Sequence, residues 1–188
     1  MINVGDKFMN PNSNYIQLDL AQEYNKMLDN AVTTIIDRKL GRTLTTLERE
    51  LESQQKTEET ENEDIQIDFY LNTQPTELGG VSTRIVIRCY RDQYLHTPID
   101  ITFLRGEQDK EIIKEKLIVI LSKGGITLDV SKPYEMQSGV KTESIIGKAP
   151  FKVWKKVRED YLEAKNEQEK ESQSTAGDEQ DANRIGPR

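Results

Sequence analysis

The chain has 188 residues, of which 31% are charged and 35% are apolar, and its formal net charge is -7. This length fits one domain, or one domain with flexible extensions. The negative balance argues against nucleic-acid binding over the whole surface but leaves room for a local basic patch. A single cysteine, Cys89, and a single histidine, His96, exclude an intramolecular disulfide and a metal site built from several such ligands.

No apolar run approaches the length of a membrane span, and the first residues lack the hydrophobic stretch of a signal peptide. We therefore expect a cytoplasmic protein that does not act at a membrane. Residues 1–12 contain turn formers without periodicity, which predicts an N-terminal arm.

From about Ser13, apolar residues recur at steps of three and four, which predicts a helix. Gly41 is expected to end or interrupt this helix as a left-handed C-cap, and a further helical stretch follows Thr43. The acidic, polar residues 53–63 predict a solvated loop inserted in the domain.

Three segments alternate between apolar and polar residues with a period of two, the pattern of strands with one buried face. They span residues 65–71, 84–90 and 99–103. Short connections rich in turn formers favour antiparallel neighbours and a meander. Cys89 falls on the inward face of the second segment, where it is expected to act as a small hydrophobe.

Residues 107–123 have the apolar periodicity of a helix, and residues 126–130 follow as a fourth alternating strand. Residues 132–148 are rich in turn formers and are expected to hold a short hairpin. The last helix is predicted to start near Pro150, since proline is favoured in the first turn of a helix. The polar composition of residues 166–188 predicts a disordered tail.

These elements predict an α+β fold with the order α-β-β-β-α-β-α. A single domain over residues 13–165 would hold a four-stranded, mainly antiparallel sheet, with helices packed on its apolar face.

No set of residues in the sequence has the spacing of a catalytic or metal centre. His96 lies between two predicted strands, with Asp92 and Asp100 nearby, and is expected to be a partly exposed loop residue. The acidic residues lack the order of an EF-hand, and the glycine pairs belong to no nucleotide-binding motif. We therefore expect a protein that is not an enzyme and holds no cofactor or metal.

Two groups of residues have the composition of an interface, one on the outward face of the sheet and one on the last helix. The sheet group is Asp68, Tyr70, Arg84, Arg88 and Tyr90, and the helix group is Phe151, Trp154, Lys155, Arg158 and Tyr161. Arginine and aromatic residues are enriched at protein interfaces, although such a sheet face is equally typical of plain solvent surface.

The helix group has two interpretations. Basic residues interleaved with aromatic ones, from Lys148 to Arg158, are a footprint of nucleic-acid binding, which would make the chain a small accessory protein. In the other, an amphipathic helix inserts its aromatic stripe into a core or a partner's groove. Acidic residues such as Glu159 interrupt the basic run and favour the second interpretation.

The order of elements from about Tyr15 to Val130 resembles the phage tail-terminator and head–tail joining family. A long helix precedes a three-strand meander, whose last strand, Ile99-Asp-Ile-Thr-Phe-Leu104, runs into a helix of the type Asp109-Lys-Glu-Ile-Ile-Lys-Glu-Lys-Leu117. The acidic loop at 53–63 and the segment after 148 depart from the family pattern.

The resemblance implies a structural protein of the virion, present in the host cytoplasm during assembly. Its copies would form a ring, as a homo-oligomer, and contact neighbouring virion proteins such as portal or tail components. The departures leave open whether the ring is a terminator, an adaptor or a connector.

Overall fold

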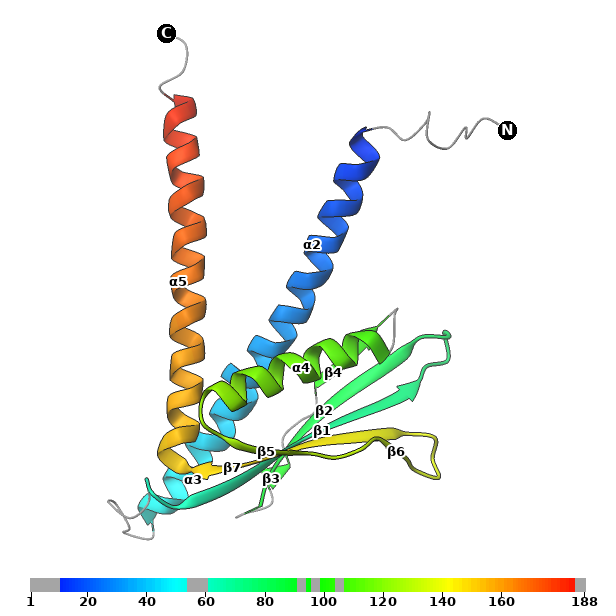
Figure 1. Ribbon diagram of the computed structural model, residues 1–188, viewed down its shortest axis with the longest axis vertical. Helices are drawn as coiled ribbons and strands as arrows, with labels where there is room; N and C mark the ends of the chain where they lie inside the picture. The colour runs from blue at the N-terminus through cyan, green and yellow to red at the C-terminus, as the bar shows by residue number, and fades with distance from the viewer. Residues whose placement is uncertain (1–10, 54–60, 91–93, 96–98, 104–106, 185–188) are drawn as a thin grey trace.

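The computed structural model describes residues 11–53, 61–90, 94–95, 99–103 and 107–184, and the side chains of residues 20–53, 61–90 and 108–172. It confirms an α+β fold, with an antiparallel sheet covered by helices (Figure 1). The expectations for most of the N-terminal arm, the middle of the acidic loop, His96 and the last four residues lie outside the described residues.

The helical layer follows the predicted order closely. Its segments are α2 (Pro11–Thr34), the π-helix η1 (Ile35–Leu40), α3 (Gly41–Ser53), α4 (Glu107–Lys123) and α5 (Phe151–Arg184). The first three follow one another without a break. Figure 1 shows α4 lying along the sheet, while α2 and α5 rise away from it and diverge.

The described residues form a sheet of seven strands, more than the four predicted. They are β1 (Asp64–Pro75), β2 (Val81–Cys89), β3 (Tyr94–Leu95), β4 (Ile99–Phe103), β5 (Thr127–Val130), β6 (Tyr134–Glu135) and β7 (Lys141–Pro150). Their order is β3-β2-β1-β7-β5, with β4 also paired to β2 and β6 to β7. The predicted meander is present as β1-β2-β4, and α4 then carries the chain to the opposite edge.

The short hairpin predicted in residues 132–148 is present as β6 and the start of β7. The sequence did not predict that β7 continues to Pro150 and lies inside the sheet, between β1 and β5. Two of its inward positions break the apolar alternation. Glu143 forms ion pairs with lysines of α4. Gly147 lies beneath a ring, because a Cβ placed there would come within 2.6 Å of Trp154 Cη2. The alternation of apolar residues is therefore interrupted in β7, because an ion pair and the indole ring take the place of small apolar contacts there.

The core lies between the helices and the odd-numbered residues of β1 and β2, as the alternation predicted. Cys89 is fully buried there. The sheet contributes Ile65, Ile67, Phe69, Leu71, Ile85 and Ile87, which pack with Leu28, Val32, Ile113, Leu117 and Leu121 of the helices.

We expected Gly41 to end or interrupt the first helix as a left-handed C-cap, but it does not have that conformation. Its φ of -58° and ψ of -43° are those of a right-handed helix, and the chain continues into α3. Instead, the glycine makes room for α5, because a Cβ at this position would come within 2.6 Å of Arg158 Nε. The Arg158 guanidinium donates to the carbonyl oxygen of Asp37 at 3.1 Å and to its carboxylate at 2.8 Å. This contact docks α5 on the π-helical turn.

Gly41→Ala is expected to lower the free energy of unfolding by about 1–3 kcal/mol, because the added Cβ displaces the Arg158 guanidinium. In an Arg158→Ala background, the same substitution should be neutral or stabilising, since alanine favours a helix over glycine. Urea unfolding of the four proteins measures this coupling. An equal cost in both backgrounds would contradict the close-approach explanation.

The helix α5 begins directly after Pro150 and continues far beyond the core. The amides of Phe151 and Lys152 donate to the carbonyl oxygens of Glu63 and Glu61, at 2.9 and 3.0 Å. The composition predicted a disordered tail from residue 166, whereas the helix extends to Arg184. This part of the chain is rich in glutamate and glutamine, which are strong helix formers, and Glu167 and Lys170 have the three-residue spacing of a favourable pair.

Candidate protein-interaction site

The even-numbered side chains of β1 and β2 lie on the face of the sheet opposite the helices. The register pairs Asp68 with Arg88, Tyr70 with Val86, and Asn72 with Arg84. All helices in the described part of the chain cover the other face (Figure 1). The structure therefore brings together the predicted sheet group, with Tyr90 directly after the end of β2.

Asp68 is the centre of a polar cluster on this face. Its carboxylate accepts hydrogen bonds from Gln66 Nε2 at 3.2 Å and from the Tyr70 hydroxyl at 3.1 Å, and the residue is only 1% exposed. The guanidinium carbon of Arg88 lies 5.7 Å from the centroid of the Tyr70 ring, within cation–π range. We call Gln66, Asp68, Tyr70, Arg88 and Tyr90 the sheet-face cluster.

The cluster changes the acidity of two of its members. Burial raises the pKa of Asp68, although the hydrogen bonds from Gln66 and Tyr70 and the positive charges of Arg88 and Lys148 oppose this rise. Burial also raises the pKa of Tyr70, and a side-chain hydrogen bond with Tyr90 and the proximity of Asp68 add to this effect. Tyr70 is therefore a neutral hydrogen-bond donor at ordinary pH.

Asp68→Asn is expected to flatten the decline of stability that accompanies rising pH. A carboxyl group whose pKa is raised by folding binds more protons in the folded than in the unfolded state, so stability falls as pH rises from its unfolded pKa through its folded pKa. Asparagine can still accept the Tyr70 hydrogen bond but does not ionise. Urea unfolding of both proteins at several pH values from 4 to 7 tests this, and a parallel pH dependence would contradict it.

The outer members of this face are open to solvent. Tyr90 is 48% exposed, Arg84 is exposed, and Tyr70 and Arg88 are half-buried. A buried carboxylate thus fixes an aromatic ring and a guanidinium at an accessible surface. Rigid aromatic and arginine side chains lose little freedom on binding, which suits them to anchor a protein partner.

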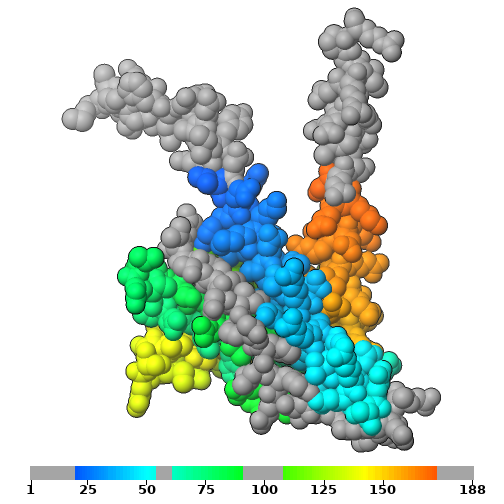
Figure 2. Space-filling view, turned by 180° about the vertical axis from the view of Figure 1, so that it is seen from behind, coloured from blue at the N-terminus to red at the C-terminus, as the bar shows by residue number. Residues whose placement is uncertain are grey.

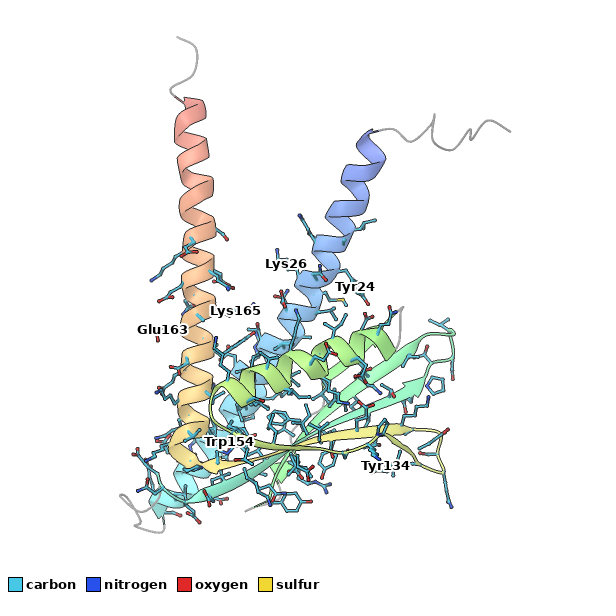
Figure 3. All side chains as sticks on the ribbon, viewed as in Figure 1. Tyr24, Lys26, Tyr134, Trp154, Glu163 and Lys165 are labelled. Carbon is cyan, nitrogen blue, oxygen red and sulfur yellow. The ribbon has the colours of Figure 1, made fainter. Side chains whose placement is uncertain are left out.

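The aromatic residues at the start of α5 lie in the protein's own core, which corrects the expectation that they face a partner. Phe151 and Trp154 are buried. Trp154 Nε1 donates to the Ile65 carbonyl oxygen at 3.0 Å, and its ring centroid is 6.4 Å from that of Phe69 (Figure 3). Of the two possibilities for an amphipathic helix, a core or a partner's groove, the aromatic stripe therefore occupies the core.

The other three residues of the helix group also make contacts within the chain. Lys155 pairs with Glu61 at 3.3 Å, Arg158 binds Asp37, and the Tyr161 hydroxyl lies 2.9 Å from Thr33 Oγ1. Because Phe151 and Trp154 are buried, the nucleic-acid interpretation loses its stacking surface. Exposed lysines on α5 are what remains of that pattern.

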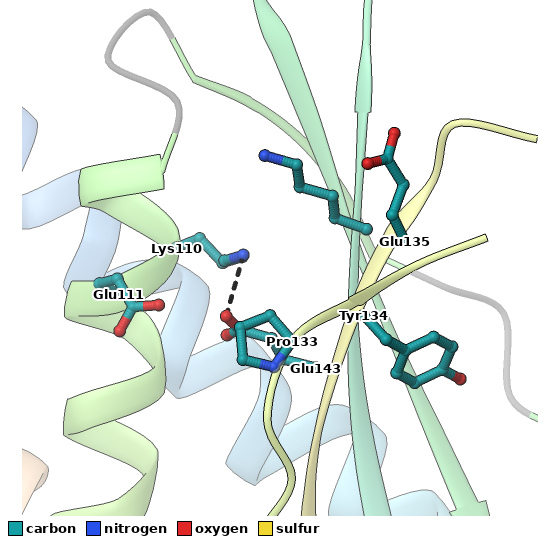
Figure 4. A pocket seen from close by; sticks show the side chains of 7 residues that line it. Lys110, Glu111, Pro133, Tyr134, Glu135 and Glu143 are labelled. Atoms are coloured by element: carbon teal, nitrogen blue, oxygen red, sulfur yellow. Dashed lines mark ion pairs between the residues drawn. The ribbon is translucent and has the colours of Figure 1, made fainter.

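A charged pocket of about 410 Å³, which the sequence did not predict, lies between the start of α4 and the strands β6 and β7 (Figure 4). Its inner wall is an ion pair, with Lys110 Nζ 3.4 Å from Glu143 Oε1 and both side chains 3% exposed. Lys114 Nζ lies 3.3 Å from the other oxygen of Glu143. Glu111 and Glu135 also line the pocket. The pocket could have been predicted only by recognising β7, since only a strand at residues 141–150 places Glu143 against α4.

The charged pocket contains opposite charges that already pair with one another, which is the arrangement of a structural ion cluster. Among the described residues, no group of three histidine, cysteine, aspartate or glutamate side chains is placed to hold a metal. Within the same part of the chain, no helix has both the length and the apolarity to span a membrane. Comparison with protein-family models, curated proteins and solved structures finds no match to the chain.

Proposed function

We propose that the chain is a non-enzymatic structural subunit of a phage-type particle, which joins neighbouring proteins through protein–protein contacts. The order of elements that resembles the head–tail joining family supports this proposal: a long helix, the meander β1-β2-β4, the helix α4 and then β5. The proposal names this class of joint and does not choose between a terminator, an adaptor and a connector.

The observation that carries the proposal is the sheet-face cluster on a face that no described helix covers. Its aromatic and arginine side chains are held by hydrogen bonds and a cation–π contact rather than left free in solvent. Preorganised side chains of these types are characteristic of interface anchors. A face of this kind is suited to bind the surface of another folded protein.

The first test is the mass of the purified full chain in solution, measured by light scattering over a concentration series. We expect a defined oligomer, and we expect Arg84→Glu combined with Tyr90→Ala to reduce the mass. These two residues lie at the accessible edge of the face, so the fold should tolerate both changes. Lys123→Glu, at an exposed position at the end of α4, is the matched control and should leave the mass unchanged. A wild-type chain that stays monomeric at every concentration would contradict assembly by self-association.

A further inference from the structure

An apolar groove of about 420 Å³ lies on the helical layer, where α2, α4 and α5 part. Ile112, Val119 and Ile120 supply its apolar surface, and Tyr161 and Lys165 of α5 form one wall. Glu115 also lines the groove, and an ion pair between Asp29 and Lys116 joins α2 to α4 beside it. Val119 is 62% exposed, an unusual position for a branched apolar side chain at the centre of a helix. Figure 2 shows α2 and α5 separating as they leave the body of the protein.

A second apolar surface runs along α2. Leu20, Tyr24, Met27 and Ala31 recur at steps of four, three and four, and thus share one side of the helix. We call these four residues the α2 stripe. Leu20 is 64% exposed and Met27 is 37% exposed. Tyr24 and Ala31 are half-buried and pack against the core, so Leu20 and Met27 form the exposed part of the stripe.

The α2 stripe and the groove lie on different sides of the same helix. Asp29 faces the groove, and at 3.6 residues per turn it is about 160° around the helix from Met27. Figure 3 agrees with this, because Tyr24 points away from α5 whereas Lys165 points toward the side on which α2 lies. One copy of the chain therefore cannot fill its own groove with its own stripe.

The stripe and the groove match in size and in charge. Leu20 to Ala31 spans about 17 Å along α2, and the groove residues of α4 span about 12 Å, the dimensions of a helix lying in a groove. Glu23 is exposed beside the stripe, and Lys165 stands at the groove wall with its Nζ 5.9 Å from the Tyr161 ring. Neither Glu23 nor Lys165 forms an ion pair with another residue of the described chain, so an incoming α2 can offer a carboxylate to a free ammonium.

We propose that the α2 stripe of one copy packs into the groove of the next copy. Because two different surfaces meet, the contact is heterologous and joins copies head to tail, closing into a ring if the rotation allows. The inference rests on the proposed function only in that both require copies to associate. It uses no residue of the sheet-face cluster, so substitutions can test the two surfaces separately.

Cross-linking between two single-cysteine additions tests the contact directly. Met27→Cys and Val119→Cys proteins, carrying tags of different size, are mixed under mild oxidation, and we expect a linked pair that contains one chain of each. Each variant alone should give no such dimer, because position 27 meets position 119 and not itself. The native Cys89 is buried and contributes only background. Leu78→Cys, at a 99% exposed turn position, replaces Val119→Cys in the matched control. Linking no stronger than in this control would overturn the inference.

Association measurements separate this inference from the proposed function. Met27→Glu or Val119→Glu should raise the dissociation constant at least about a hundredfold, because a carboxylate would enter an apolar contact. Glu23→Lys and Lys165→Glu should each weaken association about threefold and restore it when combined. If association survives the first two variants but is lost with Arg84→Glu and Tyr90→Ala, the inference fails and the proposed function stands. The reverse result supports the inference and removes the sheet face from the contact between copies, whereas a monomeric wild type overturns both.

Discussion

Glu143→Ala is expected to lower the free energy of unfolding by about 3–5 kcal/mol, among the largest effects of any single substitution in this chain. Glu143 is the carboxylate that both Lys110 and Lys114 approach, at 3.4 and 3.3 Å. Its removal leaves the ammonium group of Lys110, in a side chain only 3% exposed, without a counter-charge. A buried, uncompensated charge costs far more than the pair contributes when complete. Chemical denaturation followed by circular dichroism gives the difference.

Two further variants separate this explanation from a general sensitivity of the pocket. Glu135→Ala removes an exposed carboxylate that lines the same pocket, and it should change stability by less than about 0.5 kcal/mol. Lys110→Met combined with Glu143→Leu replaces both buried charges by apolar groups of similar size. This double variant should recover most of the loss, since apolar replacements of buried pairs are often neutral. If it is as unstable as Glu143→Ala alone, the buried charge is not the cause.

Trp154→Ala is expected to cost about 3–5 kcal/mol, because it empties the largest fully buried side chain of the core. The substitution also leaves the Ile65 carbonyl oxygen without the indole donor at 3.0 Å. Trp154→Phe keeps part of the ring volume and should cost less. Thermal or denaturant unfolding measures both variants, and equal losses would show that ring volume is not what Trp154 contributes.

Gly147 provides an internal check on the same contact. Gly147→Ala should destabilise the native protein by about 1–3 kcal/mol, because its Cβ would press on the indole ring at 2.6 Å. In the Trp154→Phe background the smaller ring leaves room, and the cost should fall. A double-mutant cycle isolates the interaction between the two positions. Purely additive effects would mean that Gly147 is required for another reason.

Periodicity was sufficient wherever an element has one continuous apolar face. It predicted α4 with both of its bounds and the pairing of β1, β2 and β4, because each of these elements buries every second or every third to fourth residue. It failed for β7, where Glu143 and Gly147 occupy inward positions for reasons that lie in α4 and α5. A pattern in one segment cannot reveal a partner that is distant in sequence.

The sequence likewise predicted one part of the candidate site, the sheet face, and not the other, the packing of α5. Alternation along two strands was enough to place Asp68, Tyr70 and Arg88 on one face, since strand register fixes which side chains share a side. The aromatic stripe of α5 showed only that one side of the helix is buried. Whether Trp154 meets a partner or the protein's own core depends on where the helix docks, and the Arg158 contact beneath Gly41 decides this. The sequence of α5 alone contains neither fact.

The position of β7 inside the sheet affects how the chain folds during synthesis. Phe69 of β1 pairs with Ile145, which lies 76 positions further along the chain. While the protein is being synthesised, β1 therefore keeps one edge unpaired until almost the whole domain has left the ribosome. Closing so long a loop slows folding, and an unpaired central strand is prone to pair with other chains. Nascent or truncated chains that end before Lys141 should aggregate, and the late arrival of β7 would be the step that makes the sheet soluble.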